Sequence, residues 1–118
     1  KLTANAVRVP TPNGSLAIMN LTLKKPVADL AAMNDLIRRA ALNGDLVNQI
    51  HYQVDPELVS SDIIGDTCCS VFDSNATIVA PDGRTVVLYA WYDNEFGYTK
   101  QVIRLAKHIS KVQRLIYY

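Results

Sequence analysis

The chain has few glycines and only two cysteines. Five of its 118 residues are glycine, and no two of them stand close enough for the G-x-G-x-x-G loop that binds a dinucleotide phosphate. The two cysteines, Cys68 and Cys69, are adjacent, and neighbouring residues rarely meet the geometry of a relaxed disulfide. The sequence therefore predicts reduced thiols and no glycine-rich dinucleotide loop in this chain.

Long apolar runs and an excess of charge are also missing. No stretch approaches the roughly eighteen consecutive apolar residues of a membrane helix, and the N-terminus lacks the apolar core of a signal peptide. The formal net charge of +1 gives no general case for a nucleic acid or an anionic membrane as partner. We expect a cytoplasmic protein with neither kind of partner.

The composition is that of a folded domain. Apolar residues make up 49% of the chain and charged residues 19%, which is typical of a globular protein and not of a disordered tail. A chain of this length buries roughly two-thirds of the surface that it exposes when unfolded. One domain with its own core is expected over residues 1 to 118.

The order of the expected elements indicates an α+β fold. Apolar runs, alternation and turn residues predict strands over residues 5 to 9, 16 to 24, 50 to 54, 57 to 60, 70 to 73, 77 to 80 and 85 to 92. Two long helices separate or follow these strands. We expect a mixed, mostly antiparallel sheet with both helices on one face. The unbroken apolar run at 86 to 91 predicts a central strand.

Both helices carry boundary signals. Asp29 can cap a helix that runs to Asn43, and Gly44 can end it in the left-handed conformation. The last helix places apolar residues as far as Ile116 on one side and basic residues on the other. We interpret its basic stripe as a solvated face, with an acidic partner or membrane surface as the alternative.

Two helices cannot cover both faces of a sheet of about seven strands. Part of an apolar sheet face would then stay open unless another chain packs on it. An uncovered apolar face of this kind would favour packing against another chain.

The run from Trp91 to Tyr98 leads directly from the central strand into the last helix. Asp93 or Asn94 can cap this helix, and Glu95 lies where the helix dipole favours negative charge. A carboxamide offers one acceptor and two donors on a planar group, so Asn94 could instead pair with the amide of a nicotinamide ring. Spacing alone leaves both roles open.

Three motifs resemble the phosphorylating glyceraldehyde-3-phosphate dehydrogenases, in the order in which that family has them. They are Ala6-Val7-Arg8-Val9-Pro10 with its following turn, Leu58-Val59-Ser60-Ser61-Asp62, and Trp91-Tyr92-Asp93-Asn94-Glu95-Phe96-Gly97-Tyr98. The resemblance covers almost the whole chain. It implies self-association through the sheet, because the catalytic-domain sheet of that family packs against a partner subunit. It implies the C-terminal part of a catalytic domain, cut from or truncated from a longer enzyme.

The resemblance also implies site residues. Arg8 would bind the substrate phosphate, since a guanidinium pairs with two phosphate oxygens at once. Asn94 would hold the nicotinamide carboxamide, with Tyr98 beside it, and Tyr92 would help to wall the pocket. Glu95 is a weaker candidate for the pocket wall, because a favourable helix dipole explains it fully. No metal site is expected.

The catalytic groups of that family have no match here. Its nucleophile lies in a Ser-Cys-Thr-Thr-Asn segment, whereas Cys68 lies in Asp66-Thr67-Cys68-Cys69-Ser70 and reads as a small buried residue. The intact enzyme would oxidise glyceraldehyde 3-phosphate with NAD and inorganic phosphate, through a thioester on a cysteine outside this chain. The chain alone is expected to be inactive and to bind no cofactor tightly.

Other interpretations stay open from sequence. The chain could be a stand-alone regulatory or oligomerisation module that binds a small ligand or a partner, or part of a sister enzyme for a longer phosphorylated aldose. The ribose contacts that separate NAD from NADP would lie in a domain outside this chain. The tail from Ser110 to Tyr118 exceeds the family pattern and has no functional explanation.

Overall fold

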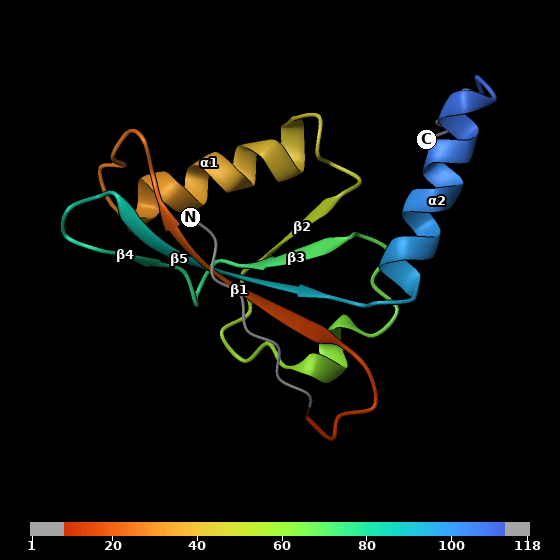
Figure 1. The fold of residues 1–118 in the computed structure, drawn as a ribbon, viewed down its shortest axis with the longest axis horizontal. Coiled ribbons are helices and arrows are strands. Elements are labelled where there is room, and N and C mark those ends of the chain that lie inside the picture. The colour runs from red at the N-terminus through yellow and green to blue at the C-terminus, as the bar shows by residue number, and fades with distance from the viewer. Residues whose placement is uncertain (1–8, 113–118) are drawn as a thin grey trace.

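The computed structural model describes residues 9 to 112, and residues 1–8 and 113–118 lie outside that description. Its elements in chain order are β1 (Ser15–Thr22), α1 (Leu30–Asn43), β2 (Ile50–Gln53), the short 3-10 helix η1 (Ser60–Ile63), β3 (Ser70–Asp73), β4 (Ile78–Val79), β5 (Thr85–Tyr92) and α2 (Phe96–Ile109). Figure 1 shows their arrangement.

The five strands of the described chain form one mixed sheet. The strand order is β1-β5-β3-β2, and β4 pairs with β5 beside this path. Only β2 and β3 run parallel, whereas β5 is antiparallel to β1, β3 and β4. The α+β class with a mostly antiparallel sheet is thus confirmed, and β5 is the central strand that its apolar run predicted.

The core lies between α1 and one face of the sheet. Its buried side chains are Met33 of α1, Phe72 of β3, and Val86 and Leu88 of β5. Val86 and Leu88 are two positions apart, so they point to the same face of their strand. Met33 therefore fills the core.

Helix α1 begins as expected but ends differently. Oδ1 of Asp29 accepts a hydrogen bond of 2.7 Å from the backbone N–H of Ala32, which confirms the predicted cap. Gly44 follows the helix in an extended conformation (φ −103°, ψ −168°), so the predicted left-handed ending is wrong. A Cβ at Gly44 would lie 3.0 Å from the carbonyl oxygen of Ala40, so close approach is what favours glycine there.

Helix α2 extends away from the sheet (Figure 1). The expectation that both helices cover one face therefore holds for α1 alone. The apolar side chains Leu105 and Ile109 of α2 are 58% and 71% exposed. The helix ends at Ile109, short of the predicted extent, and Lys111 takes a positive φ of 53° just beyond it. Neither helix described here is long and apolar enough to cross a membrane.

The strand expected over residues 57 to 60 is absent, and this prediction was wrong. Oδ1 of Asp55 accepts a hydrogen bond from the N–H of Glu57, and Oδ2 of Asp62 accepts one from the N–H of Val59. Such side-chain bonds to nearby backbone compete with strand pairing. The strand expected over residues 5 to 9 falls almost wholly outside the described residues.

The face of the sheet opposite α1 is partly open. Ile18 of β1 pairs with Tyr89 of β5, which alternates with the buried Leu88 and so points away from the core. Ile18 is 54% exposed, and Ile78, which pairs with Val87 on the same face, is 53% exposed. The predicted open apolar surface therefore exists among the described residues.

Candidate functional site

The junction between β5 and α2 is built around the side chain of Asp93. Oδ1 of Asp93 accepts hydrogen bonds of 2.9 Å from the backbone N–H groups of Glu95 and Phe96. These are two of the donors that a helix leaves unpaired at its start. Of the two capping candidates in the sequence, the structure uses Asp93.

The capping role of Asp93 leaves Asn94 unconstrained by the helix. Asn94 is exposed in the turn between β5 and α2, and its side chain makes no hydrogen bond within residues 9 to 112. The amide therefore keeps its acceptor and both donors for a ligand, which is what pairing with a second carboxamide requires.

The other oxygen of Asp93 binds two distant segments. Oδ2 accepts a hydrogen bond of 2.9 Å from the backbone N–H of Gly65, in the loop after η1. It accepts another of 3.0 Å from the side-chain amide of Asn13, in the turn before β1. Asp93 is only 1% exposed, so its four hydrogen bonds are what compensate for burying the carboxylate.

These hydrogen bonds also set the acidity of Asp93. The N–H groups of Gly65, Phe96 and Glu95, together with the amide of Asn13, stabilise the ionised form and hold the pKa of Asp93 below its usual value of 3.8. Burial opposes this shift and does not reverse it. The sequence showed Asp93 as a cap only, because no local pattern reveals partners 28 and 80 residues away.

Arg8, the predicted phosphate ligand, lies outside the described residues. The turn that follows it is described, and Asn13 in this turn contacts Asp93, the residue before Asn94. Asn13 lies five positions after Arg8, and an extended chain spans at most about 18 Å over five residues. The position of Arg8 relative to Asn94 stays a prediction.

The other predicted site residues lie at the surface around the junction. Tyr92 at the end of β5 is 38% exposed and Tyr98 in the first turn of α2 is 72% exposed. Glu95 is exposed as well and accepts no capping hydrogen bond with its side chain. All three side chains are therefore exposed to solvent at this junction.

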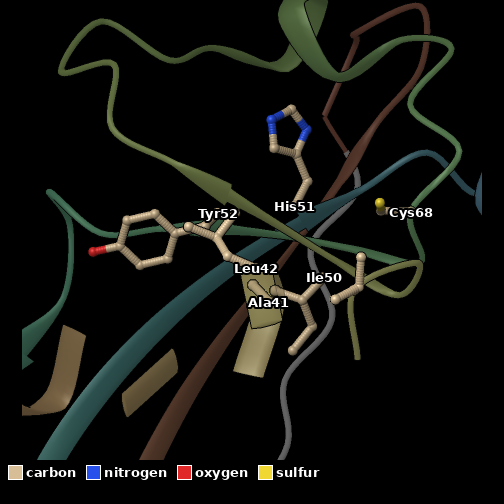
Figure 2. A pocket seen from close by; sticks show the side chains of 7 residues that line it. Ala41, Leu42, Ile50, His51, Tyr52 and Cys68 are labelled. Carbon is tan, nitrogen blue, oxygen red and sulfur yellow. The ribbon is translucent and has the colours of Figure 1, made fainter. Parts of the chain in front are cut away.

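A shallow hollow of about 310 Å³ lies elsewhere, between α1, β2 and the loop before β3 (Figure 2). It is lined by Ala41, Leu42, Val47, Ile50, His51, Tyr52 and Cys68. None of the predicted site residues lines it. Nδ1 of His51 lies 2.6 Å from Oδ2 of Asp66, so the imidazole is paired with a carboxylate outside the hollow's lining.

Cys68, the cysteine in this hollow, is not arranged as a nucleophile. Burial and the nearby carboxylate of Asp66 raise the pKa of the Cys68 thiol above its usual value of 9.0. A nucleophilic cysteine requires the opposite shift, because the thiolate is the reactive form. No three His, Cys, Asp or Glu side chains of residues 9 to 112 form a group that could hold a metal ion.

Comparison with known proteins gives one consistent family. A glyceraldehyde-3-phosphate dehydrogenase-like protein of Pseudomonas aeruginosa (strain UCBPP-PA14) is 47% identical over 112 residues, which are 95% of this chain and 24% of that protein. The glyceraldehyde-3-phosphate dehydrogenase of Kitasatospora aureofaciens is 43% identical over 87% of this chain and 30% of its own length. That of Escherichia fergusonii is 42% identical over 94% of this chain and 32% of its own.

The chain spans between 24% and 32% of the length of these three relatives. The family model for the C-terminal domain of glyceraldehyde 3-phosphate dehydrogenase matches residues 1–94, so the match includes both the turn with Asn13 and the junction with Asp93 and Asn94. The chain therefore belongs to the glyceraldehyde 3-phosphate dehydrogenase C-terminal domain family.

Proposed function

We propose that this chain is the C-terminal part of the catalytic domain of an NAD-dependent, phosphorylating glyceraldehyde-3-phosphate dehydrogenase. The relatives that carry the name of this enzyme are about three times as long as the segment that they share with this chain. In this proposal the chain supplies binding groups, and the nucleophile and the dinucleotide domain belong to other parts of the intact protein.

The exposed side-chain amide of Asn94, which makes no hydrogen bond to any residue from 9 to 112, is the observation that supports this function most. It stands in the turn between the central strand and α2, and Asp93 takes over the capping role that would otherwise occupy it. A carboxamide can pair with the nicotinamide carboxamide in both directions and so help to select the ring face that meets the substrate. NAD, when bound, would accept the hydride of the aldehyde.

Arg8 would bind the phosphate of the triose substrate. The support for this role is indirect. Asn13, in the turn that follows Arg8, donates a hydrogen bond to Asp93, and Asp93 is the residue before Asn94. A guanidinium and a carboxamide at one junction would hold the two ends of the reaction, the substrate and the ring. Tyr98, Tyr92 and Glu95 lie around this junction and would border the pocket once the rest of the protein covers it.

The thiols of this chain would take no part in the chemistry. The raised pKa of Cys68 keeps its thiol protonated at neutral pH, so the attack on the aldehyde would come from a cysteine elsewhere. The thiohemiacetal formed by this attack would lose its hydride to become a thioester, and inorganic phosphate would then cleave the thioester to an acyl phosphate. The choice between NAD and NADP would be made by ribose contacts in the dinucleotide domain.

We propose a cytoplasmic protein that self-associates, and the partly open sheet face supports the self-association. Ile18 and Ile78 leave apolar surface on the side of the sheet opposite α1. Burying such surface against a second copy would be favourable in proportion to its area. The stand-alone regulatory module is not favoured, because the family model and the relatives all carry the dehydrogenase name.

The experiment that tests this function compares the isolated chain with the full-length protein that contains it. NAD reduction with glyceraldehyde 3-phosphate and inorganic phosphate should occur with the full-length protein only, and should stop when phosphate is withheld. Measurable NAD reduction by the purified 118-residue chain would contradict the division of roles, and so would an inactive full-length protein.

A further inference from the structure

Helix α2 is anchored at its start and uncovered beyond it. Gly97 is the one buried residue of the helix, and a Cβ there would lie 3.0 Å from the carbonyl oxygen of Cys68, so the first turn packs closely on the loop before β3. Nε2 of Gln101 donates a hydrogen bond of 3.1 Å to the carbonyl of Asn48. Beyond Gln101 the helix projects away from the sheet (Figure 1), and within residues 9 to 112 no later side chain of α2 bonds to another element.

The projecting part of α2 has one apolar side. Val102, Leu105 and Ile109 recur at helical spacing and are 46%, 58% and 71% exposed. Tyr98, one turn before Val102, extends this side to the helix start and is 72% exposed. A helix of this length is only marginally stable in water by itself. Its apolar side therefore needs a surface that covers it.

The opposite side of α2 is basic and suits solvent. Its cations follow the same spacing two positions out of step with the apolar side, and they are Lys100, Arg104, Lys107 and Lys111. Burying unpaired cations would cost far more than leaving them in water. A partner that covers α2 therefore meets the apolar side, which consists of Tyr98, Val102, Leu105 and Ile109.

We propose that the apolar side of α2 docks on the dinucleotide-binding domain of the same polypeptide in the full-length protein. This inference rests on the proposed function, because the role of Asn94 identifies the occupant. Asn94 lies two residues before α2, and Tyr98 lies in the first turn. The part of the protein that brings the nicotinamide ring to Asn94 must therefore lie against the start of α2, where the apolar side begins.

The length of the relatives supplies such an occupant. This chain contains no dinucleotide loop, and the enzymes that share its segment are about three times as long. A second copy docked on α2 would cover the same surface beside Asn94 and would keep the nicotinamide ring away from it. The proposed function therefore favours the dinucleotide domain over a second copy.

The occupant can be identified by photo-crosslinking in the full-length protein. A benzophenone side chain in place of Leu105 inserts into a C–H bond of whatever covers it, and mass spectrometry of the digested product identifies the partner peptide. The cross-link should join position 105 to the dinucleotide domain of the same copy. An equal mixture of isotope-labelled and unlabelled copies separates this outcome from a cross-link between copies. A cross-link to a second copy, or to no protein segment, would overturn the inference.

Hydrogen exchange of the full-length protein provides a second measurement with a matched control. The double variant Leu105→Gln with Ile109→Gln should speed amide exchange over residues 103 to 109 by on the order of tenfold or more, because burial of these apolar side chains would stabilise the docked helix. Lys100→Gln with Lys107→Gln introduces the same good helix former on the basic side and should leave exchange unchanged. Equal exchange rates in the two double variants would overturn the inference.

Both measurements are independent of catalysis, so the two proposals can fail separately. If the full-length protein reduces NAD but position 105 is linked elsewhere, only the docking of α2 is wrong. If position 105 is linked to the dinucleotide domain but the protein does not oxidise glyceraldehyde 3-phosphate, the docking stands and the proposed function has failed.

Discussion

The side-chain amide of Asn13 donates a hydrogen bond of 3.0 Å to Oδ2 of Asp93, a residue 80 positions later in the chain. The same oxygen accepts a hydrogen bond from the N–H of Gly65. These contacts bring the turn before β1 and the loop after η1 to the end of the central strand. The junction between β5 and α2 is therefore held together by contacts from three loops.

The first prediction concerns the pH dependence of stability. The pKa of Asp93 in the folded chain lies below the usual 3.8, mainly because of the hydrogen bond from Gly65 and the other donors around it. The ionised side chain therefore stabilises the fold above the pKa of the unfolded state, and this stabilisation is lost as pH falls through the lower folded pKa. In the Asp93→Asn variant, the free energy of unfolding should therefore depend less on pH in this range.

Urea denaturation of the 118-residue chain between about pH 5 and pH 2 measures this effect. Asp35 and Asp82 also have lowered pKa values, so the parent curve contains their contributions too. Asp82→Asn is the control. Its free energy of unfolding should still fall with decreasing pH by the amount that Asp93 contributes. Equal slopes for the parent and Asp93→Asn would refute the prediction.

The second prediction concerns the packing of α1. Met33 is 5% exposed and belongs to the core cluster, whereas Leu36 on the same helix is 57% exposed. Met33→Ala should lower the free energy of unfolding by about 2 to 4 kcal/mol, because it removes buried atoms and leaves a cavity. Leu36→Ala should change it by less than about 0.5 kcal/mol. Similar losses for both would mean that α1 does not cover the sheet as described.

The third prediction concerns the turn between β4 and β5. Gly83 has a φ of +65°, and a Cβ there would lie 2.3 Å from the carbonyl oxygen of Val27. Gly65 has a φ of +85° but open space around the Cβ position. Gly65→Ala should cost about 1 to 2 kcal/mol from backbone strain alone. Gly83→Ala should cost clearly more, because the steric clash adds to the strain.

Thermal or urea unfolding of both glycine variants provides the comparison. Equal destabilisation by the two substitutions would show that the segment around Val27 does not pack on the turn at Gly83. The hydrogen bond of 2.8 Å from the N–H of Val27 to the carbonyl of Gly83 is the contact at stake.

The fourth prediction concerns self-association through the open sheet face. Ile18→Lys should weaken the association of the chain, because it places a charge in the apolar surface that a second copy would bury. Leu36→Lys is the control, since Leu36 is exposed to a similar degree on α1. Analytical ultracentrifugation at micromolar concentration should show oligomers for the parent and the control. A purely monomeric parent would contradict the prediction.

Local patterns in the sequence were sufficient for several elements. The apolar run at 86 to 91 predicted the central strand β5, and Asp29 predicted the start of α1. Each of these depends on interactions within a few residues or on burial of a whole strand. They could be inferred because neighbouring residues carry the cause.

Other features depend on distant residues and could not be predicted. The direction of α2 depends on how the helix packs against other parts of the fold, and the sequence around α2 does not indicate that packing. The contacts of Asp93 with Asn13 and Gly65 arise only once the sheet has formed. Gly44 was predicted from its usual role after a helix, but it is its missing Cβ that the chain uses.

The kinetics of two single variants of the full-length protein test the central claim most directly. Asn94→Ala should raise the KM for NAD and leave that for glyceraldehyde 3-phosphate nearly unchanged. Arg8→Ala should do the reverse, by roughly 10-fold or more, since a charge-assisted phosphate contact contributes about 1.5 to 3 kcal/mol. If neither variant changed the KM of its own ligand, the chain would not hold the binding groups assigned to it.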